Sequence, residues 1–339
     1  MLTLQKLAAA VQQLQQKHIP KAKARRFRLG VKQLSLHEFS SLNAAGRNLG
    51  INRWTGENRM RRLVTDSVLS DQLQQLLVSE MFAGRSGYWY CSMDHSQFGP
   101  FCIAILAVSN RAGRAIPVWC QVNVSEAGLI APLLLALETL LHELTNIAPD
   151  LKLVLVMDRW FASDKLFQLF AKYGTYFIAR TKSDKRVRLP WDPSWYKLPI
   201  AELSFLETEI TYRSHRLRLI RSELRPGMKD PEPWFLLTNL PEEITRRMVL
   251  NRYAERFEIE EAFKDVKWLN RLEWQRIKKP EVIRSLLLFV FLGWWLLWKL
   301  GDKPSQQPKV HPKKRLSWFR LAWEQLQVLL QAPLLSLLT

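Results

Sequence analysis

Two aspartates follow stretches of sequence that are typical of buried strands. Asp94 closes the aromatic and apolar segment Tyr88–Met93, and Asp158 closes Leu151–Met157, LKLVLVM. An acid in this position leaves a rigid element at the edge of the core, where α/β sheets hold ligands and metals. The same position also suits an acid that only caps a turn or a helix. We expect both carboxylates to bind metal, with a capping role as the alternative.

A third acid, Glu260, lies in a predicted helix whose charges are sorted by face. The helix is expected from about Pro241 to Trp268, and at about 100° per residue five of its side chains fall within an arc of roughly 80°. These residues are Tyr253, Arg256, Glu260, Lys264 and Lys267. The other acids of the segment lie off this stripe, a sorting that the alternative of a solvated, salt-bridged face does not require. The stripe favours an acid that holds Mg²⁺ beside groups that contact phosphate oxygens.

Three carboxylates suit the cleavage of phosphodiesters. Two Mg²⁺ ions about 3.5–4 Å apart activate the incoming oxygen and stabilise the leaving oxygen of an in-line displacement. We expect Asp94 to bridge the two ions and Asp158 and Glu260 each to complete one, with Mn²⁺ able to substitute. This chemistry needs no histidine as a general base.

The elements predicted around these acids form a mixed α/β domain. In chain order they are strands at 88–93, 101–109 and 115–124, a helix at 129–144, a strand at 151–157, a helix that Ser163 opens, and a strand at 176–181. The first three strands are expected to form an antiparallel meander. The order β-β-β-α-β-α-β predicts a mixed sheet with helices on its faces.

The remaining segments differ in composition. Residues 182–233 predict a small β-rich insertion, after which a strand at 234–238 returns towards the sheet. Residues 1–84 are helical and basic; within 38–63, a helix, a tight turn and a second helix indicate either a DNA-binding helix-turn-helix or a plain helical hairpin. Residues 282–299 predict a buried core helix, and 301–339 a basic linker with a C-terminal helix.

The charge of the chain points to a polyanionic partner. The 339 residues include 50 Lys and Arg against 31 Asp and Glu, a net charge of +19, and the excess is spread over three zones, 1–80, 182–230 and 275–339. Such zones suit a long DNA duplex, although a merely solvated basic surface is the alternative for each.

Three cysteines without a CxxC pair argue against disulfides and zinc and fit a reducing cytosol. The longest apolar run, 285–298, is shorter than the ~20 residues that span a bilayer, so no membrane is expected.

The spacing Tyr253-x₂-Arg256-x₃-Glu260-x₆-Lys267 resembles the tyrosine–arginine–glutamate–lysine signature of bacterial insertion-sequence DDE transposases, the branch that includes the family-four elements. Asp94 in SMDHS and Asp158 in VLVMDRWFAS look like the first two acids of that family's triad. The resemblance covers roughly residues 85–300. It implies an RNase H-like catalytic domain with a five-stranded mixed sheet, a helical N-terminal module, and the β-rich insertion before the glutamate helix.

The resemblance also implies partners and a place of action. The expected partners are double-stranded DNA, as transposon terminal inverted repeats and as target, and a second copy of the chain in a synaptic homodimer. The expected location is the bacterial cytoplasm, in association with the nucleoid. Several members of the family cut and paste through a hairpin intermediate.

Two further side chains are candidates for DNA contact. Family members that form hairpins stack a flipped base on a tryptophan before the glutamate helix, and Trp234 stands in a similar place. A tryptophan that opens an apolar strand is more often a core residue. Arg159, next to Asp158, and Arg180, near a strand end, are expected to contact phosphate.

Two other functions remain open from the sequence alone. An RNase H-like DNA endonuclease without strand transfer would need the same three acids. A DNA-binding regulator would use the basic zones without a metal. A glycosidase with paired carboxylates explains neither the charge of +19 nor the glutamate flanked by Lys and Arg.

Overall fold

The protein is described by a computed structural model over residues 4–35, 42–47, 49, 51–109, 114–125, 129–191, 198–223, 233–269 and 277–300. The chain divides into two compact units. The first unit comprises residues 1–83, 95–132 and 258–339, and the second comprises residues 84–94 and 133–257. The predicted linker and helix at 301–339 lie outside the described residues.

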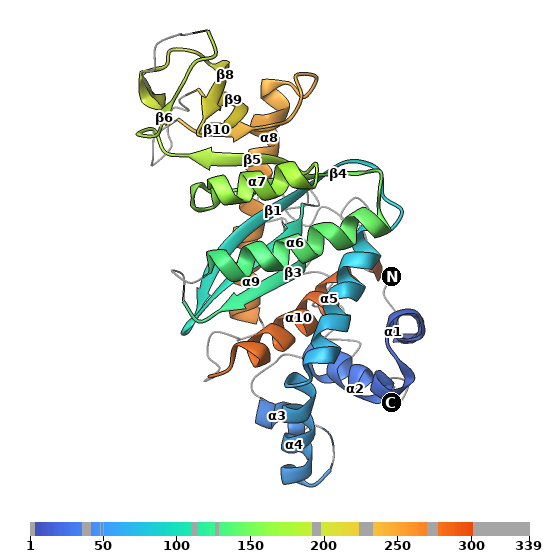
Figure 1. The fold of residues 1–339 in the computed structure, drawn as a ribbon. Coiled ribbons are helices and arrows are strands. Elements are labelled where there is room, and N and C mark those ends of the chain that lie inside the picture. The colour runs from blue at the N-terminus through green and yellow to red at the C-terminus, as the bar shows by residue number, and fades with distance from the viewer. Residues whose placement is uncertain are drawn as a thin grey trace, which may run out of the picture. The chain divides into compact units, whose positions relative to one another are not determined.

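The second unit is built on a mixed sheet with the strand order β1-β4-β5-β10-β9-β8 (Figure 1). Strands β1 (Gly87–Phe98, of which 87–94 belong to this unit), β4 (Leu151–Met157) and β5 (Tyr176–Thr181) run parallel to one another. Strands β10 (Phe235–Thr238), β9 (His215–Arg221) and β8 (Glu207–Tyr212) continue the sheet antiparallel. The parallel part therefore carries the two predicted aspartates, and the antiparallel part comes largely from the predicted insertion.

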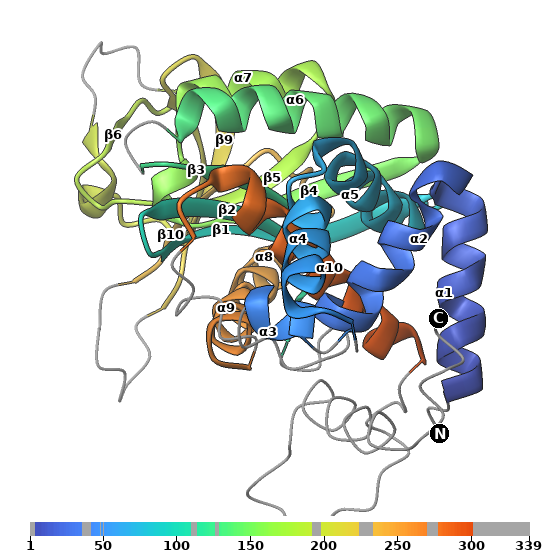
Figure 2. The same ribbon diagram turned by 90° about the horizontal axis from the view of Figure 1, so that it is seen from below.

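Helices cover both faces of this sheet. The rings of Phe167 in α7 (Asp164–Lys172) and Phe177 in β5 stack with centroids 4.3 Å apart. On the opposite face, Val249 and Tyr253 of α8 (Arg246–Glu255) pack in a buried cluster with residues of β4, β5, β9 and β10. Figure 2 shows α7 with α6 (Ile130–Ile147) on one side of the strands and α8 on the other. Successive side chains of a strand point to opposite faces of the sheet, so a continuous apolar run such as that of β4 gives apolar side chains to both faces.

The predicted order of elements is confirmed, including the bounds of β4 and β5 and the Ser163 cap, whose Oγ accepts a hydrogen bond from Leu166 N at 3.4 Å. The prediction of five strands is too low. Three strands from the segment 182–238 enlarge the sheet instead of forming a separate module, because β10 pairs with β5, β9 with β10 and β8 with β9. Among the described residues of this segment, three short elements lie outside that sheet, namely β6 (Arg186–Val187), β7 (Leu198–Pro199) and the 3-10 turn Ile200–Glu202.

The single helix predicted from Pro241 to Trp268 is wrong. Helix α8 ends at Glu255, and α9 (Phe257–Leu269) begins after Arg256. The backbone N–H of Arg256 bonds to the carbonyl of Tyr253 at 3.1 Å, a tighter turn than the α-helix. Tyr253 and Arg256 therefore belong to the second unit, whereas Glu260 and the lysines that follow belong to the first. The predicted stripe is not one continuous helical face.

The first unit is mainly helical. Its elements are α1 (Leu4–His18), α2 (Lys21–Gly30), a π-helical turn (Val31–Ser35), α3 (Leu42–Arg47), α4 (Arg53–Val64), α5 (Ser67–Phe82), β2 (Phe101–Val108), β3 (Ile116–Asn123), α9 and α10 (Pro280–Leu300). Strands β2 and β3 pair antiparallel, as the meander predicts. Helix α10 is buried along residues 285–297 and packs on β3 and α5, which confirms the prediction of a core helix.

Within the described part of the chain, two helices are long and apolar enough to cross a membrane, α6 and α10. In α10 the apolar window is 83% buried within the protein, as in the core helix of a soluble domain. In α6 the share is 28%, and Leu135 is exposed.

Two glycines bring α3 and α4 together at backbone distance. A Cβ atom added at Gly56 would lie 2.2 Å from the carbonyl oxygen of Gly46, and one added at Gly46 would lie 2.6 Å from the amide nitrogen of Glu57. Asn52 caps α4, because its side chain accepts a hydrogen bond from Trp54 N at 3.0 Å. The helix pair predicted within 38–63 is thereby confirmed for the described residues, which exclude 36–41, 48 and 50.

Glu80 of α5 ties three helices of the first unit together. Lys17 Nζ donates to Glu80 Oε1 at 2.7 Å, His18 Nε2 lies 2.9 Å from the same oxygen, and Lys299 Nζ donates to Oε2 at 3.2 Å. Burial alone would raise the pKa of the Glu80 carboxyl. The hydrogen bonds and the lysine charges outweigh burial and lower this pKa from 4.5 to about 2. The ionised form of Glu80 therefore stabilises the packing of α1 and α10 on α5.

We predict that Glu80→Gln lowers the free energy of unfolding by about 1–2 kcal/mol at pH 7. Because the folded pKa is depressed, this stabilisation is complete above pH 4.5 and is lost as the pH falls towards about 2. The difference from wild type, measured by urea unfolding at several pH values, should therefore shrink across that window. Glu138→Gln, which removes an exposed pair with Lys172, is the control. A difference independent of pH would show that the charge of Glu80 is not what matters.

Candidate functional site

The parallel register of β1 and β4 places Asp94 and Asp158 next to each other. Met93 and Met157 are Cα partners, and an aspartate follows each of them directly in the chain. Neighbouring strands lie about 4.8 Å apart, so both carboxylates belong to the same edge of the parallel pairing. One detail of the prediction is wrong, because β1 continues to Phe98 and Asp94 lies inside it. Asp94 marks the end of the pairing with β4, not the end of the strand.

Asp94 is held by a buried arginine. Arg256 Nη1 donates to Asp94 Oδ2 at 2.8 Å; the arginine side chain is 5% exposed and the aspartate 14%. The guanidinium also lies 4.9 Å from the ring centroid of Phe257. A buried charge without a partner costs several kcal/mol, so each member of this pair stabilises the other. Arg256 thus acts first as a counter-cation for Asp94, which the sequence did not predict.

Asp158 has no structural partner that would explain its place. It precedes the 3-10 turn Arg159–Phe161, yet its side chain makes no capping hydrogen bond. Among the described residues its carboxylate forms neither a hydrogen bond nor an ion pair. Asp158 thus occupies the N-cap position of this turn, and its backbone carbonyl accepts a hydrogen bond from Phe161 N at 3.1 Å, but its side chain does not cap the turn. The half-buried carboxylate is therefore available to bind a ligand.

Tyr253 is fully buried beside this pair. Burial raises the pKa of its hydroxyl to about 12; the charge of Asp158 adds to this, while Arg256 and Arg180 oppose it. The hydroxyl oxygen makes no hydrogen bond within the described part of the chain. Unsatisfied buried hydroxyls are uncommon and cost free energy. Tyr253 is consequently a neutral group with an available donor next to two acids.

Trp234 is half-buried, which fits both a core residue and a residue that stacks on a base. Its ring packs against the buried cluster of α8 and the sheet, with its centroid 5.0 Å from that of Tyr253. Its backbone N–H donates to Ser222 Oγ at 2.8 Å. The ring also lies 6.0 Å from Phe257, whose side chain is 40% exposed. Sequence reasoning missed Phe257; its signal is an aromatic residue that directly follows the arginine of the spacing motif.

Glu260, Lys264 and Lys267 lie on α9 in the first unit. Glu260 is half-buried, Lys264 pairs with Glu261, and Lys267 Nζ lies 5.0 Å from the ring centroid of Phe98. The acids that the sequence sorts away from Glu260 have structural partners of their own. Ser109 donates to Glu258 at 2.9 Å, and Arg114 forms ion pairs with Glu261 and Asp265. These contacts fasten α9 to the loop between β2 and β3.

Two arginines of the second unit complete the predicted set. Arg159 is exposed immediately after Asp158. Arg180 is half-buried in β5, where it is the Cα partner of Leu236, and its charge reaches Tyr253. The structure therefore brings Asp94, Asp158, Tyr253, Arg256 and Trp234 together within one unit.

The donor set at this edge fits a hard divalent cation. Among the described residues, no group of three or more His, Cys, Asp or Glu is arranged to hold a metal ion. Asp94 and Asp158 alone offer two carboxylates from one sheet edge. Mg²⁺ is commonly held by one or two carboxylates, with water and phosphate completing its octahedron. The ion pair of Asp94 with Arg256 shows that this edge already attracts positive charge.

Comparison with known proteins relates part of the chain to a protein family. A family model with the description "Transposase DDE domain" matches residues 128–296. The matched range contains Asp158, Trp234 and the whole spacing from Tyr253 to Lys267, and it begins after Asp94. The mixed sheet with helices on both faces is consistent with that domain. No curated protein matches the chain.

We predict that Asp94→Asn and Arg256→Gln each lower the free energy of unfolding by about 2–4 kcal/mol, because each leaves one buried charge unpaired. The double variant should be less destabilised than the sum, with a coupling of about 1–3 kcal/mol measured by urea unfolding. Asp158→Asn is the matched control and should unfold like wild type. Additive losses would mean that the pair does not stabilise the second unit.

Proposed function

Because the chain belongs to the DDE transposases of insertion-sequence type, we propose that it cuts DNA at the ends of an insertion sequence and joins those ends to target DNA. The reaction is metal-dependent cut-and-paste transposition by an RNase H-like catalytic domain. The observation that carries this proposal is the pair Asp94 and Asp158, which strand register puts side by side, with the Asp158 side chain in no hydrogen bond or ion pair among the described residues.

We assign the acidic residues to the metal site. Asp94, Asp158 and Glu260 would hold the divalent ions, Mg²⁺ or Mn²⁺ in its place. Bound there, the ions supply a polarised oxygen nucleophile and charge stabilisation for the leaving oxygen. Glu260 is assigned by its place four residues after Arg256 in the spacing motif. This assignment rests on the sequence alone, because Glu260 belongs to the other compact unit.

The neighbouring side chains bind and orient the DNA backbone. Tyr253 stays neutral with a pKa of about 12, so its hydroxyl donates a hydrogen bond to a phosphate oxygen without carrying charge. Arg256 neutralises Asp94 before DNA and metal arrive, and its guanidinium can then turn to phosphate. Lys264, Lys267 and Arg159 add positive charge, and Trp234 stacks a flipped base during hairpin formation.

The DNA partners are the terminal inverted repeats and the target duplex, bound by a homodimer in the cytoplasm of a bacterium, at the nucleoid. We assign residues 1–84 to the end-binding module and 85–300 to the catalytic domain with the insertion at 182–233. Support for the module comes from α4, where Trp54 is 74% exposed beside the exposed Arg53, Arg61 and Arg62. An aromatic ring among arginines suits contact with a nucleic acid.

Two alternatives make different predictions. A nuclease would cut ends without joining them, so joining of pre-cut ends by purified protein with Mg²⁺ separates it from a transposase. A DNA-binding regulator would keep its activity without Asp158. The unpartnered Asp158 carboxylate favours the enzymes over the regulator.

We predict that Asp158→Asn and Glu260→Gln abolish end cleavage while end binding, measured by gel shift, stays near wild type. Loss should exceed about 1,000-fold, because charge stabilisation at the reacting phosphate disappears. Asp158→Asn is the cleaner variant, since it removes no structural contact. Asp94→Asn should also abolish cleavage, but its fold must be verified because of Arg256. Asp150→Asn, at an exposed turn, is the control. Nicking at the wild-type rate by any one variant would remove that residue from the site.

We predict that Trp234→Ala blocks hairpin formation and preserves nicking of the first strand. Base stacking contributes about 1–3 kcal/mol, equivalent to about 10- to 100-fold in the hairpin step. Denaturing gels of end DNA resolve both steps. Trp191→Ala, which removes an exposed tryptophan outside the buried cluster, is the control. Equal loss of both steps would assign Trp234 to packing alone.

A further inference from the structure

Two charged residues are buried as a whole within the ranges that the structure describes, and they lie at opposite ends of α8. Arg256, at the C-terminal end, pairs with Asp94. Arg218, in β9, is 8% exposed and contacts the loop that leads into the N-terminal end. Burying an arginine is costly unless its donors are satisfied, so an arginine in this position has a specific task.

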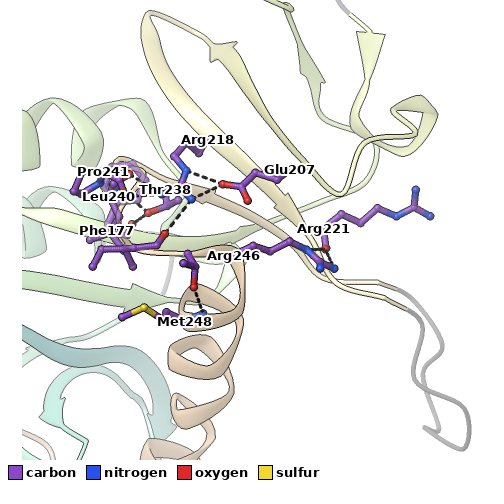
Figure 3. Close-up of polar contacts among 11 residues, drawn as sticks. Phe177, Glu207, Arg218, Arg221, Thr238, Leu240, Pro241, Arg246 and Met248 are labelled. Carbon is purple, nitrogen blue, oxygen red and sulfur yellow. Dashed lines mark hydrogen bonds and ion pairs between the residues drawn. The ribbon is translucent and has the colours of Figure 1, made fainter.

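Arg218 binds the loop between β10 and α8 through its carbonyl groups. Its Nη1 donates to the carbonyl oxygens of Leu240 and Pro241 at 3.0 and 2.7 Å, and its Nη2 donates to that of Ile244 at 3.0 Å. Its Nε donates to Glu207 of β8 at 2.9 Å, and a second contact with the same carboxylate makes the pair bidentate. Figure 3 shows the guanidinium of Arg218 between Glu207 and this loop. One planar group thus fixes three loop carbonyls to the strand pair β8–β9.

Neighbouring contacts hold the same loop at both of its ends. Thr238 Oγ1 donates to the carbonyl of Phe177 in β5 at 2.6 Å and accepts a hydrogen bond from Leu240 N at 3.1 Å. At the helix start, Arg246 donates to the carbonyl of Arg221 in β9 at 3.2 and 3.1 Å. The beginning of α8 is therefore tied to β9 at two points, one buried and one half-buried.

The helix transmits this placement to the acids. From Arg246 to Arg256 the axis rises about 15 Å, so a small rotation at the start displaces the far end. Tyr253 and Arg256 are the residues at that far end, and Arg256 meets Asp94. A lysine at position 218 could satisfy one or two acceptors but would lack the planar fork that reaches three carbonyls and a carboxylate.

We propose that Arg218 is a positioning residue for DNA cleavage: it sets the start of α8 and thereby the geometry of Tyr253 and Arg256 beside Asp94. The inference rests on the proposed function, and it gives strands β8 and β9 a task in catalysis. Arg218 itself touches neither DNA nor metal. Its effect should pass through Arg256.

The test compares Arg218→Gln, Arg218→Lys and Glu207→Gln with Arg216→Gln. Arg216 lies two residues earlier in β9, its side chain is 81% exposed, and it is the matched control. Single-turnover end cleavage should fall about 10- to 100-fold in Arg218→Gln. The loss should be smaller in Arg218→Lys and Glu207→Gln, and absent in Arg216→Gln. End binding should stay near wild type in all four.

Coupling to Arg256 separates positioning from a general loss of structure. In an Arg256→Lys background, where the guanidinium is already gone, Arg218→Gln should cost much less than in wild type. An equal fold-loss in both backgrounds would overturn the proposal, as would wild-type cleavage by Arg218→Gln. If Arg218→Gln does not fold, Glu207→Gln and Arg218→Lys carry the same comparison.

A readout that needs no cleavage keeps the inference separate from the proposed function. Trp234 lies against Tyr253 of α8, so its ¹⁹F resonance in protein labelled with 5-fluorotryptophan reports the placement of that helix. The resonance, assigned with Trp234→Phe, should shift in Arg218→Lys and Glu207→Gln and stay in place in Arg216→Gln. An unshifted resonance in both variants would overturn the inference. Wild-type protein that fails to cut or join end DNA would overturn only the proposed function.

Discussion

The parallel pairing of β1 with β4 is the constraint on which the candidate site depends. Met93 pairs with Met157, and an aspartate follows each of them, so the pairing puts the two carboxylates side by side. A slip of one residue would separate them. The pairing is secured by the buried apolar residues of both strands and by the helices that cover both faces of the sheet. The site therefore gains its precision from the core of the second unit and not from a loop.

Helix α8 is the second half of this arrangement. It packs Val249 and Tyr253 on the same sheet, and a buried arginine is bound at each of its ends. The two arginines bind different groups. Arg218 donates to neutral backbone carbonyls and to one surface carboxylate, whereas Arg256 donates to the carboxylate of Asp94. Phosphate and metal would compete with that second contact.

Sequence reasoning found what depends on local pattern. The apolar runs that end at Asp158 and Thr181 gave correct strands, and the sorting of acids along α9 agrees with the partners of Glu258 and Asp265. What failed depends on tertiary contacts. The break at Arg256 follows from a tight turn and an ion pair 162 residues distant in the chain, and the joining of β10, β9 and β8 to β5 follows from sheet pairing. The role of Arg218 could not be predicted from the sequence, because its partners are backbone carbonyls, which every residue type has.

The most direct test of the central claim is to locate the metal on the polypeptide. Fe²⁺ substituted for Mg²⁺ cuts the backbone near its binding site when ascorbate and peroxide are added, and mass spectrometry maps the cuts. The account predicts cuts close to residues 94 and 158, suppressed by excess Mg²⁺ and lost in Asp158→Asn. Cuts elsewhere, or the same cuts in Asp158→Asn, would contradict the assignment of the paired strand edge as the metal site.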